Sequence, residues 1–442
     1  MAEPRKADLL ITGGTLLCMD EGRRVLAGHS IAIQKGRIVD IFADGNVPYA
    51  PLESLDASGC IVMPGLINAH THLPMTYFRG LADDLPLETW LNEYIWPLEG
   101  KLLNSQFIRD SALHGAAEMI QNGITQIHDM YFDMPAIAEA CLEAGLRAII
   151  GGAVIETQAA IHASDRPWLE YLLETRQRYT GNALVDFDLA PHSIYVCRRE
   201  TLEKCAQAAS EHGFLLHMHL SETRGEVAEC LHQHGRKPVF YLRELGMLDL
   251  PAVYAHGIWV DDDEIELLAS APASIAICTE CNLKLASGIL PLADYLKNGV
   301  NVCFATDGVA SNNNLDLLAE LDLTAKLHKA VNNDPTFLPA EQALRMATIG
   351  AAKALGIAAR RGSLSIGKDA DICVLDTASL AGQPLYNPYS QVVYALGSRA
   401  VRDVVIAGEL VYRDGRHTRI EEQKLLRDAL QYGELIAREL RA

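Results

Sequence analysis

The stretch GLINAHTHLPMT places His70 and His72 one residue apart, directly after an apolar run that begins at Cys60. In extended backbone, residues i and i+2 point to the same face, so a strand here would present both imidazoles together at its end. Such a pair can bind a metal ion, or it can be two unrelated surface side chains. The pair alone does not distinguish these readings.

Other apolar runs end in polar side chains of the same kinds. The residues concerned are His217, His219 and Glu222 in HMHLSE, His256 in YAHG and Asp307 in ATDG. A histidine at the end of an apolar strand is unfavourable unless a partner satisfies it. Four strand ends of this composition therefore indicate one shared site rather than separate core histidines bonded to carbonyl groups.

Four of these side chains form the predicted metal site, namely His70, His72, His219 and Asp307. Three neutral imidazoles and one carboxylate suit Zn²⁺ best, and Fe²⁺, Mn²⁺ or Ni²⁺ less well. With one position left for water, we expect one divalent metal ion per subunit in a site of the catalytic kind.

The remaining polar residues can act beside the metal ion. Glu222 lies three residues after His219, where the strand has turned into a loop, so it can face a water molecule and transfer its proton. His256 can stabilise the same oxygen, although a structural bond from its Nδ1 to the backbone is the alternative. His217 lies deeper in its strand, and we expect it to support a ligand from behind. The predicted catalytic residues are Glu222, His256 and Asp307.

The elements that position these residues follow an alternating pattern. Between about Ile61 and Gly362, apolar runs of strand length alternate with helical patterns such as IRDSALHGAAEMIQNG, which predicts parallel strands. The candidate strands are CIVMPGLI, ITQIHDM, RAIIGGAVI, VDFDLAP, FLLHMHL, AVYAHGI, SIAICTE and NVCFATD. Their number favours an α/β fold with a TIM-type (β/α)8 barrel, in which chemistry takes place at the carboxyl ends of the strands.

The residue pattern at both ends of the chain differs from that of the barrel region. DLLITGGTLLCMD and DVVIAGELVYRDGR combine short strands with Gly and Asp turns. We predict a small β-sandwich domain from residues 1–60 and 363–418, and a barrel domain from residues 61–362. Residues 419–442 have helical periodicity and should form a C-terminal helix on the barrel or on a partner subunit.

The composition excludes several classes of protein. Of the 442 residues 49% are hydrophobic and 21% charged, as in ordinary globular proteins. A formal charge of −19 repels phosphate backbones and anionic lipids, so nucleic-acid and membrane partners are not expected. The sequence has no apolar signal segment or membrane span, which predicts a cytoplasmic protein. The ten cysteines are scattered, as is typical of reduced, buried side chains.

Several longer motifs carry a resemblance to a known family. They are PGLINAHTHLPMTYFRGLADDLPLETWL, HMHLSET, AHG, CNLKLASGI and ATDGVASNNNLD, in this order. From about Ala7 to about Gly408 the chain resembles the amidohydrolase superfamily. Within it the chain is similar to the methylthioadenosine/S-adenosylhomocysteine deaminase group, which hydrolyses the 6-amino group of an adenine nucleoside. The resemblance implies that the four predicted ligands hold one metal ion.

The resemblance also implies substrate contacts that composition and spacing do not reveal. Glu99, in WPLE, matches the position that binds the ribose hydroxyls, and His192, in PHS, matches the one that contacts the adenine ring. Trp90, in ETWL, matches a residue of the pocket wall, although simple packing of its helix is the alternative. Glu222 and Asp307 complete the expected substrate contacts.

The absence of lysine from one part of the sequence indicates the number of metal ions. Binuclear relatives bridge two metal ions with a carbamylated lysine on the fourth strand, but this chain has no lysine between Lys101 and Lys204. We therefore expect a single-metal site.

Two departures from the family pattern affect the expected substrate and pocket. Around the third strand an arginine would meet the carboxylate of a homocysteine tail, but Gly151 and Gly152 stand there, with Arg166 available from the following loop. Methylthioadenosine, which has no carboxylate, is therefore expected before S-adenosylhomocysteine. Cys281 stands where a serine is expected, and we expect it and Cys278 to line the pocket rather than to bind zinc.

The expected activity is metal-dependent hydrolytic deamination of an adenine nucleoside, most readily methylthioadenosine, with S-adenosylhomocysteine or adenosine next. The same scaffold could instead act on guanine, an 8-oxopurine or a chlorotriazine. An alternative of another class, a non-catalytic scaffold on a hydrolase fold, is disfavoured by the intact ligand set. We expect a small-molecule nucleoside as the substrate and a homo-oligomeric assembly.

Overall fold

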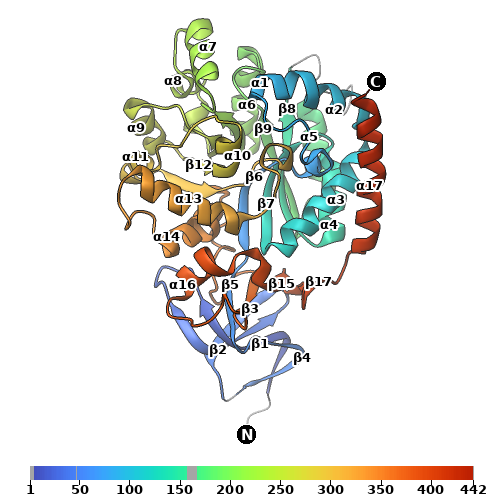
Figure 1. Ribbon diagram of the computed structural model, residues 1–442, viewed down its shortest axis with the longest axis vertical. Coiled ribbons are helices and arrows are strands. Elements are labelled where there is room, and N and C mark those ends of the chain that lie inside the picture. The colour runs from blue at the N-terminus through green and yellow to red at the C-terminus, as the bar shows by residue number, and fades with distance from the viewer. Residues whose placement is uncertain (1–3, 46, 157–166, 442) are drawn as a thin grey trace.

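The computed structural model describes residues 4–45, 47–156 and 167–441. Figure 1 shows a barrel of strands surrounded by helices and, below it, a sheet built from strands near the N-terminus and strands late in the chain. The C-terminal helix runs along one side of the barrel. This arrangement confirms the predicted TIM-type barrel with an additional β domain from the chain ends.

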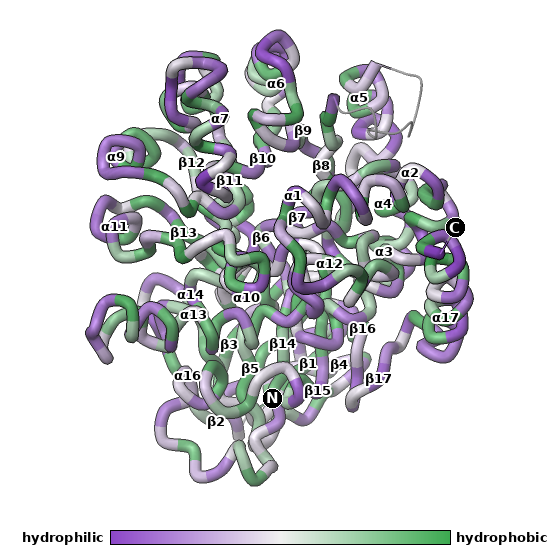
Figure 2. The backbone as a smooth tube through the Cα atoms, turned by 45° about the horizontal axis from the view of Figure 1, so that its top comes forward, coloured by the Kyte–Doolittle hydropathy of each residue, from purple (hydrophilic) through white to green (hydrophobic). Residues whose placement is uncertain are grey.

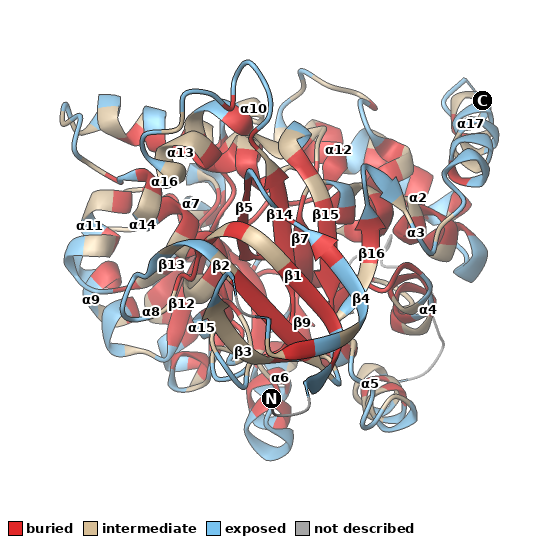
Figure 3. Cartoon of the chain, turned by 90° about the horizontal axis from the view of Figure 1, so that it is seen from below, coloured by how far each residue is buried: buried red, intermediate tan, exposed pale blue. Residues whose placement is uncertain are grey.

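Eight strands form the barrel sheet, in the order β13-β12-β11-β10-β9-β8-β7-β6, and their pairing is parallel. They are β6 (Leu66–Thr71), β7 (Ile124–Tyr131), β8 (Arg147–Val154), β9 (Val185–Pro191), β10 (Leu216–Leu220), β11 (Ala252–His256), β12 (Ala273–Ile277) and β13 (Asn301–Phe304). Most of their residues are buried, as the view from below shows (Figure 3). Burial on both faces explains why these strands read as continuous apolar runs.

The run CIVMPGLI, expected as the first barrel strand, is divided between two sheets. Cys60–Pro64 (β5) pairs antiparallel with β14 (Ile372–Asp376), whereas Leu66–Thr71 (β6) opens the barrel. Gly65 lies between them, where a β-carbon would come within 2.1 Å of the Thr125 side chain. The expectation of one strand was wrong because apolar periodicity cannot separate two consecutive buried strands.

Side chains join the first and last strands of the barrel. Asn68 Nδ2 donates to Thr306 Oγ1 over 2.7 Å, and Asn68 Oδ1 accepts from the Thr306 backbone N–H over 3.1 Å. The Asp307 N–H donates to the carbonyl oxygen of His70 over 3.1 Å. The ends of β6 and β13 are thereby held side by side.

Helices cover the outside of the barrel and turn polar residues toward solvent (Figure 2). One of them, α3 (Ser105–Gln121), follows the cap residue Asn104, whose side chain accepts the first free backbone N–H groups. The other α-helices are α1 (Leu87–Thr89), α2 (Trp96–Leu102), α4 (Met134–Ala144), α5 (Trp168–Arg178), α6 (Arg199–His212), α7 (Arg224–His234), α8 (Pro238–Glu244), α9 (Asp262–Ser270), α10 (Thr279–Lys284), α11 (Leu292–Lys297), α12 (Val309–Asn312), α13 (Leu317–Val331), α14 (Ala340–Arg345), α15 (Ala351–Ala354) and α16 (Pro388–Gln391).

The chain ends meet in one nine-stranded sheet, ordered β17-β16-β15-β14-β5-β1-β2-β3, with β4 paired to β1. Its strands other than β5 and β14 are β1 (Arg5–Leu17), β2 (Val25–Gln34), β3 (Arg37–Ala43), β4 (Tyr49–Asp56), β15 (Val401–Ile406), β16 (Glu409–Arg413) and β17 (Arg416–His417). Leu9, Ile31 and Val405 belong to its own buried core. The pairing of β5 with β14 joins the N-terminal strands to the C-terminal ones.

A buried ionic cluster lies where this sheet meets the base of the barrel. Arg147, the first residue of β8, has a side chain only 2% exposed, and its Nε is 2.9 Å from a carboxylate oxygen of Asp371. Its Nη2 is 3.5 Å from Asp369, and Arg361 approaches the same two carboxylates. Paired charges are the form in which ions can be buried.

The C-terminal helix α17 (Glu422–Glu439) packs on the barrel. Tyr432 stacks on Tyr77 with ring centroids 4.8 Å apart, and its hydroxyl lies 3.1 Å from Asp110 Oδ2. Of the two packing partners considered for this helix, the barrel is thus the one observed.

None of the helices in the described part of the chain has the length and apolar character needed to cross a membrane.

Replacing Arg147 with methionine should destabilise the fold, because Asp371 would lose its closest cation while remaining buried. We expect a loss of about 3–5 kcal/mol in the free energy of unfolding, measured by urea titration. Arg413→Met removes a partner of the exposed Glu53 and is the control, with a loss of about 1 kcal/mol or less. Equal losses in the two variants would contradict a role for the buried cluster.

Candidate active site

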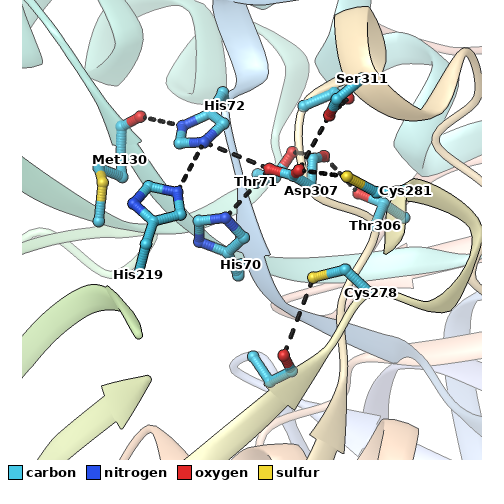
Figure 4. A network of polar contacts seen from close by, with 12 residues as sticks. His70, Thr71, His72, Met130, His219, Cys278, Cys281, Thr306, Asp307 and Ser311 are labelled. Atoms are coloured by element: carbon cyan, nitrogen blue, oxygen red, sulfur yellow. Dashed lines mark hydrogen bonds and ion pairs between the residues drawn. The ribbon is translucent and has the colours of Figure 1, made fainter. Parts of the chain in front are cut away.

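The candidate site lies at the carboxyl ends of the barrel strands. His70 is in β6 and His72 follows it, His219 is in β10, His256 ends β11 and Asp307 follows β13. Figure 4 shows the imidazoles of His70, His72 and His219 turned toward one another and toward the Asp307 carboxylate. The structure thus brings all the predicted strand-end residues to one place.

The donor atoms are close enough to share one cation. Asp307 Oδ1 lies 3.1 Å from His70 Nε2 and 3.3 Å from His72 Nε2. His72 Nε2 is also 3.3 Å from His219 Nε2. A second, overlapping set consists of His70, His219, His256 and Asp307, whose ligand atoms all lie within 4.8 Å of one another.

Each of the three expected histidine ligands is fixed by a contact of its other ring nitrogen. His70 Nδ1 is 2.7 Å from His217 Nε2, which is the supporting contact expected of His217. His72 Nδ1 is 2.6 Å from the Met130 carbonyl oxygen. His219 Nδ1 is 2.8 Å from the carbonyl oxygen of His192. These contacts orient Nε2 of each ring into the site.

The Asp307 carboxylate is held from the opposite side. Cys281 Sγ donates to Oδ2 over 2.8 Å and Ser311 Oγ donates to the same oxygen over 2.9 Å, so Oδ1 is left facing the histidines. The expectation that Cys281 and Cys278 line the pocket was wrong, because both side chains are fully buried away from the cavity described below.

The charge states of the cluster suit a cation. Burial lowers the pKa of His70 to about 3 and that of His219 well below its ordinary value, so these rings are neutral. Burial alone would raise the pKa of Asp307, but the bonds from His70 and His72 hold it well below the usual range. Burial alone would lower the pKa of His72, but its bond to the charged Asp307 raises that pKa to about 9, so a cation that binds here would displace the His72 proton. Three neutral imidazoles and one ionised carboxylate would then form the donor set that Zn²⁺ and similar ions bind.

Glu222 and His256 form a second pair beside this cluster. Glu222 Oε2 lies 3.7 Å from His256 Nε2, and Ser287 Oγ donates to Glu222 Oε1 over 3.3 Å. His256 Nδ1 is 2.9 Å from the side-chain oxygen of Asn282 rather than bonded to the backbone. Burial raises the pKa of Glu222, which favours a carboxyl group that can both take up and release a proton.

The turn that carries Glu222 is held by another buried carboxylate. Glu226 Oε1 accepts the backbone N–H of Ser221 over 3.0 Å, and Oε2 accepts that of Glu222 over 2.8 Å. Ser221 has a positive φ of 49°, a conformation that is unfavourable for a residue with a side chain. Glu226 therefore fixes a strained turn immediately next to Glu222.

A cavity opens from the cluster and contains the expected substrate contacts. Glu99, His192 and Trp90 line it together with His72, Glu222 and Asp307. Much of the remaining wall is apolar or aromatic, with Leu87, Leu91, Ile95, Trp96, Phe132, Ile155 and Leu285. Trp90 also donates its indole N–H to the Leu81 carbonyl over 3.3 Å, so packing and pocket lining are combined in one residue.

Within the described residues, no lysine or arginine lines this cavity. Arg166, considered as a partner for a substrate carboxylate, lies outside the described residues. Gly151, found in place of an arginine, packs in the barrel wall, where a β-carbon would come within 2.7 Å of that of Ala190. The described wall therefore offers apolar contacts rather than a site for an anionic tail.

Several residues of the site were not found from the sequence. They are Tyr131, Tyr195, Glu226, Asn282 and Ser311. Tyr195 lines the cavity, and the other four act through contacts with residues of other elements or of a nearby turn. The residue types of all five are common in strands and helices. Only the four-residue spacing of Glu222 and Glu226 offered a local signal.

A (β/α)8 barrel that gathers histidines, an aspartate and a glutamate at its catalytic end has the construction of a metal-dependent hydrolase. Residues 61–411 match the amidohydrolase family, and the chain belongs to that family. The resemblance inferred from the motifs is thereby confirmed.

Similar proteins match nearly the whole chain. A 5-methylthioadenosine/S-adenosylhomocysteine deaminase of Thermodesulfovibrio yellowstonii is 39% identical over 95% of this chain and 97% of its own. A 5'-deoxyadenosine deaminase of Methanothermobacter thermautotrophicus is 40% identical over 95% and 96%, respectively. The crystal structure of an adenosine deaminase from Xanthomonas campestris with bound zinc has a TM-score of 0.95 and 35% identity, covering 98% of this chain and 99% of that one.

Replacing Glu226 with glutamine should impair the turn that positions Glu222, because an amide NH₂ would face one of the two backbone N–H groups. We expect kcat to fall by about tenfold to a hundredfold while the bound metal is unchanged. The rate of ammonia release gives kcat, and metal analysis of the purified variant gives its metal content. Glu229→Gln, at an exposed position of the same helix, is the matched control and should keep full activity. Loss of metal in the Glu226 variant would contradict this account.

Proposed function

We propose that this protein is a zinc-dependent deaminase of adenine nucleosides, with 5'-methylthioadenosine as the preferred substrate. The observation that carries the proposal is the buried His/Asp cluster with Glu222 beside it, opening into a cavity lined by Glu99 and His192. The names of the similar deaminases described above support the same reaction.

His70, His72, His219 and Asp307 would hold one Zn²⁺ ion. We prefer His72 to His256 as the fourth ligand because His72 Nε2 lies 3.3 Å from both Asp307 Oδ1 and His219 Nε2, whereas His256 Nε2 faces Glu222. When bound, the ion supplies the Lewis acidity that makes water a nucleophile near neutral pH.

The protein's own groups move the protons. Glu222 takes a proton from the attacking water and delivers it to the purine ring, which prepares C6 for attack. His256, oriented by Asn282, and Asp307 steady the attacking oxygen. Glu222 then transfers the proton that remains on the C6 oxygen to the 6-amino group, which leaves as ammonia while the C6 oxygen becomes a carbonyl. One water proton is thus on the ring and the other on ammonia, and water and the nucleoside yield the inosine-type product.

Different residues of the cavity would bind the adenine ring and the ribose of the nucleoside. His192 contacts the adenine ring, Glu99 binds the ribose hydroxyls and Trp90 forms part of the wall. Because the described wall is apolar and lacks a cation, a methylthio group is favoured over a homocysteine tail, and adenosine and S-adenosylhomocysteine rank behind it. A cytoplasmic location and a homo-oligomeric assembly also belong to this proposal.

Ammonia release over a substrate panel tests the proposed function. The panel contains methylthioadenosine, adenosine, S-adenosylhomocysteine, guanine, an 8-oxopurine and a chlorotriazine. We expect the highest kcat/KM with methylthioadenosine. A preference for guanine, the 8-oxopurine or the triazine would overturn the nucleoside assignment, and protein that purifies without metal and releases no ammonia would indicate a non-catalytic scaffold.

Replacing Glu222 with glutamine should retain zinc and remove proton transfer. We expect kcat to fall by about 10²- to 10⁴-fold, since an amide cannot accept and return the proton. Metal content by atomic absorption should match that of the unmodified protein. Full activity in this variant would refute the role of Glu222.

A further inference from the structure

Tyr131 and Glu99 make a direct contact at the wall of the cavity. Tyr131 is the last residue of β7, Glu99 belongs to α2, and the tyrosine hydroxyl donates a hydrogen bond to Glu99 Oε1. Both residues are nearly excluded from solvent, with 5% and 4% of their surface exposed, and both line the cavity. A buried carboxylate requires such a partner to remain oriented.

The contact occupies only one of the two carboxylate oxygens. Among the described residues, Glu99 Oε2 has no hydrogen-bond partner, so this oxygen is available to a ligand in the cavity. A carboxylate held in this way can accept hydrogen bonds from two neighbouring hydroxyl groups, as a ribose presents them.

The end of β7 also connects this contact to the metal cluster. The carbonyl oxygen of Met130, the residue before Tyr131, lies 2.6 Å from His72 Nδ1. Consecutive residues of one buried strand therefore fix a histidine of the cluster and the Glu99 carboxylate. The strand end sets the separation between the reaction centre and the place where a sugar would bind.

We propose that Tyr131 is a positioning residue that aims Glu99 at the ribose hydroxyls and so makes the enzyme selective for nucleosides that carry both of them. The inference rests on the proposed deaminase function and adds a determinant of sugar specificity to it. Tyr131 acts through Glu99, the residue that would accept the hydrogen bonds of the sugar hydroxyls.

The charge of Glu99 offers an independent readout. Burial raises the pKa of Glu99 to about 7, while the bond from Tyr131 and the charge of His72 act in the opposite direction. These two groups, from β7 and from the end of β6, are the titratable groups that act on it within the described residues. Because the ionised carboxylate is the better acceptor, KM for a riboside should rise as the pH falls below about 7.

The test compares adenosine with 2',3'-dideoxyadenosine, which lacks both hydroxyls. In the unmodified protein we expect kcat/KM to favour adenosine by about 10- to 100-fold, as hydrogen bonds to a charged group would give. In Tyr131→Phe this preference should fall at least about fivefold, through KM for adenosine, while the kinetic constants for the dideoxynucleoside stay unchanged. The pH below which KM for adenosine rises should shift upward in this variant, because a donor that lowers the pKa of Glu99 has been removed.

Two variants complete the design. Glu99→Gln should lose the same preference, and adding Tyr131→Phe to it should have no further effect. Tyr77→Phe is the matched control, because Tyr77 lies outside the cavity and its buried hydroxyl has no hydrogen-bond partner in the described part of the chain.

The outcomes separate the inference from the function on which it rests. If the unmodified protein deaminates both nucleosides equally well, or if Tyr131→Phe lowers kcat/KM equally for both, the role of Tyr131 is refuted and the deaminase function stands. If neither adenosine nor methylthioadenosine releases ammonia, both proposals fail.

Discussion

The bond between the first and last strands of the barrel is the constraint on which the site depends. Asp307 follows β13, and its N–H reaches the carbonyl oxygen of His70 in β6, 237 residues away in the sequence. Asn68 and Thr306 reinforce this junction one step deeper in the barrel. Without it the carboxylate and the histidine pair would belong to opposite edges of an open sheet. Closure therefore creates the cluster as well as the fold.

Preorganisation is the common property of the residues around the cluster. Backbone carbonyl groups orient His72 and His219, and side chains orient His70, His256 and Asp307 from behind. Three residues at these strand ends, Ser221, His256 and Asp307, have left-handed backbone conformations with φ of 49°, 71° and 62°. Strain of this kind persists where the surrounding contacts determine the conformation, and it is common at active sites. These strained conformations hold the donor atoms in position before any ligand binds.

The sequence predicted the barrel and the strand-end residues because both signals are local. A histidine or aspartate after an apolar run is visible without knowing what lies opposite, and the barrel then places such ends on one rim. The division of CIVMPGLI at Gly65 was missed because β5 and β6 are equally apolar. Cys281 was misplaced, and Tyr131 was missed, because their partners Asp307 and Glu99 come from distant elements. Whether a side chain faces the cavity depends on tertiary packing, and the neighbouring sequence does not reveal it.

The pairing of β5 with β14 has a consequence for biosynthesis. β5 is finished once residue 64 has been made, but its partner β14 ends only at Asp376, after the entire barrel. On the ribosome, therefore, one edge of the N-terminal sheet stays open while more than three hundred residues emerge. Exposed strand edges invite contacts with other nascent chains. That edge can close only after the barrel has been synthesised, and molecular chaperones would have a long opportunity to act before then.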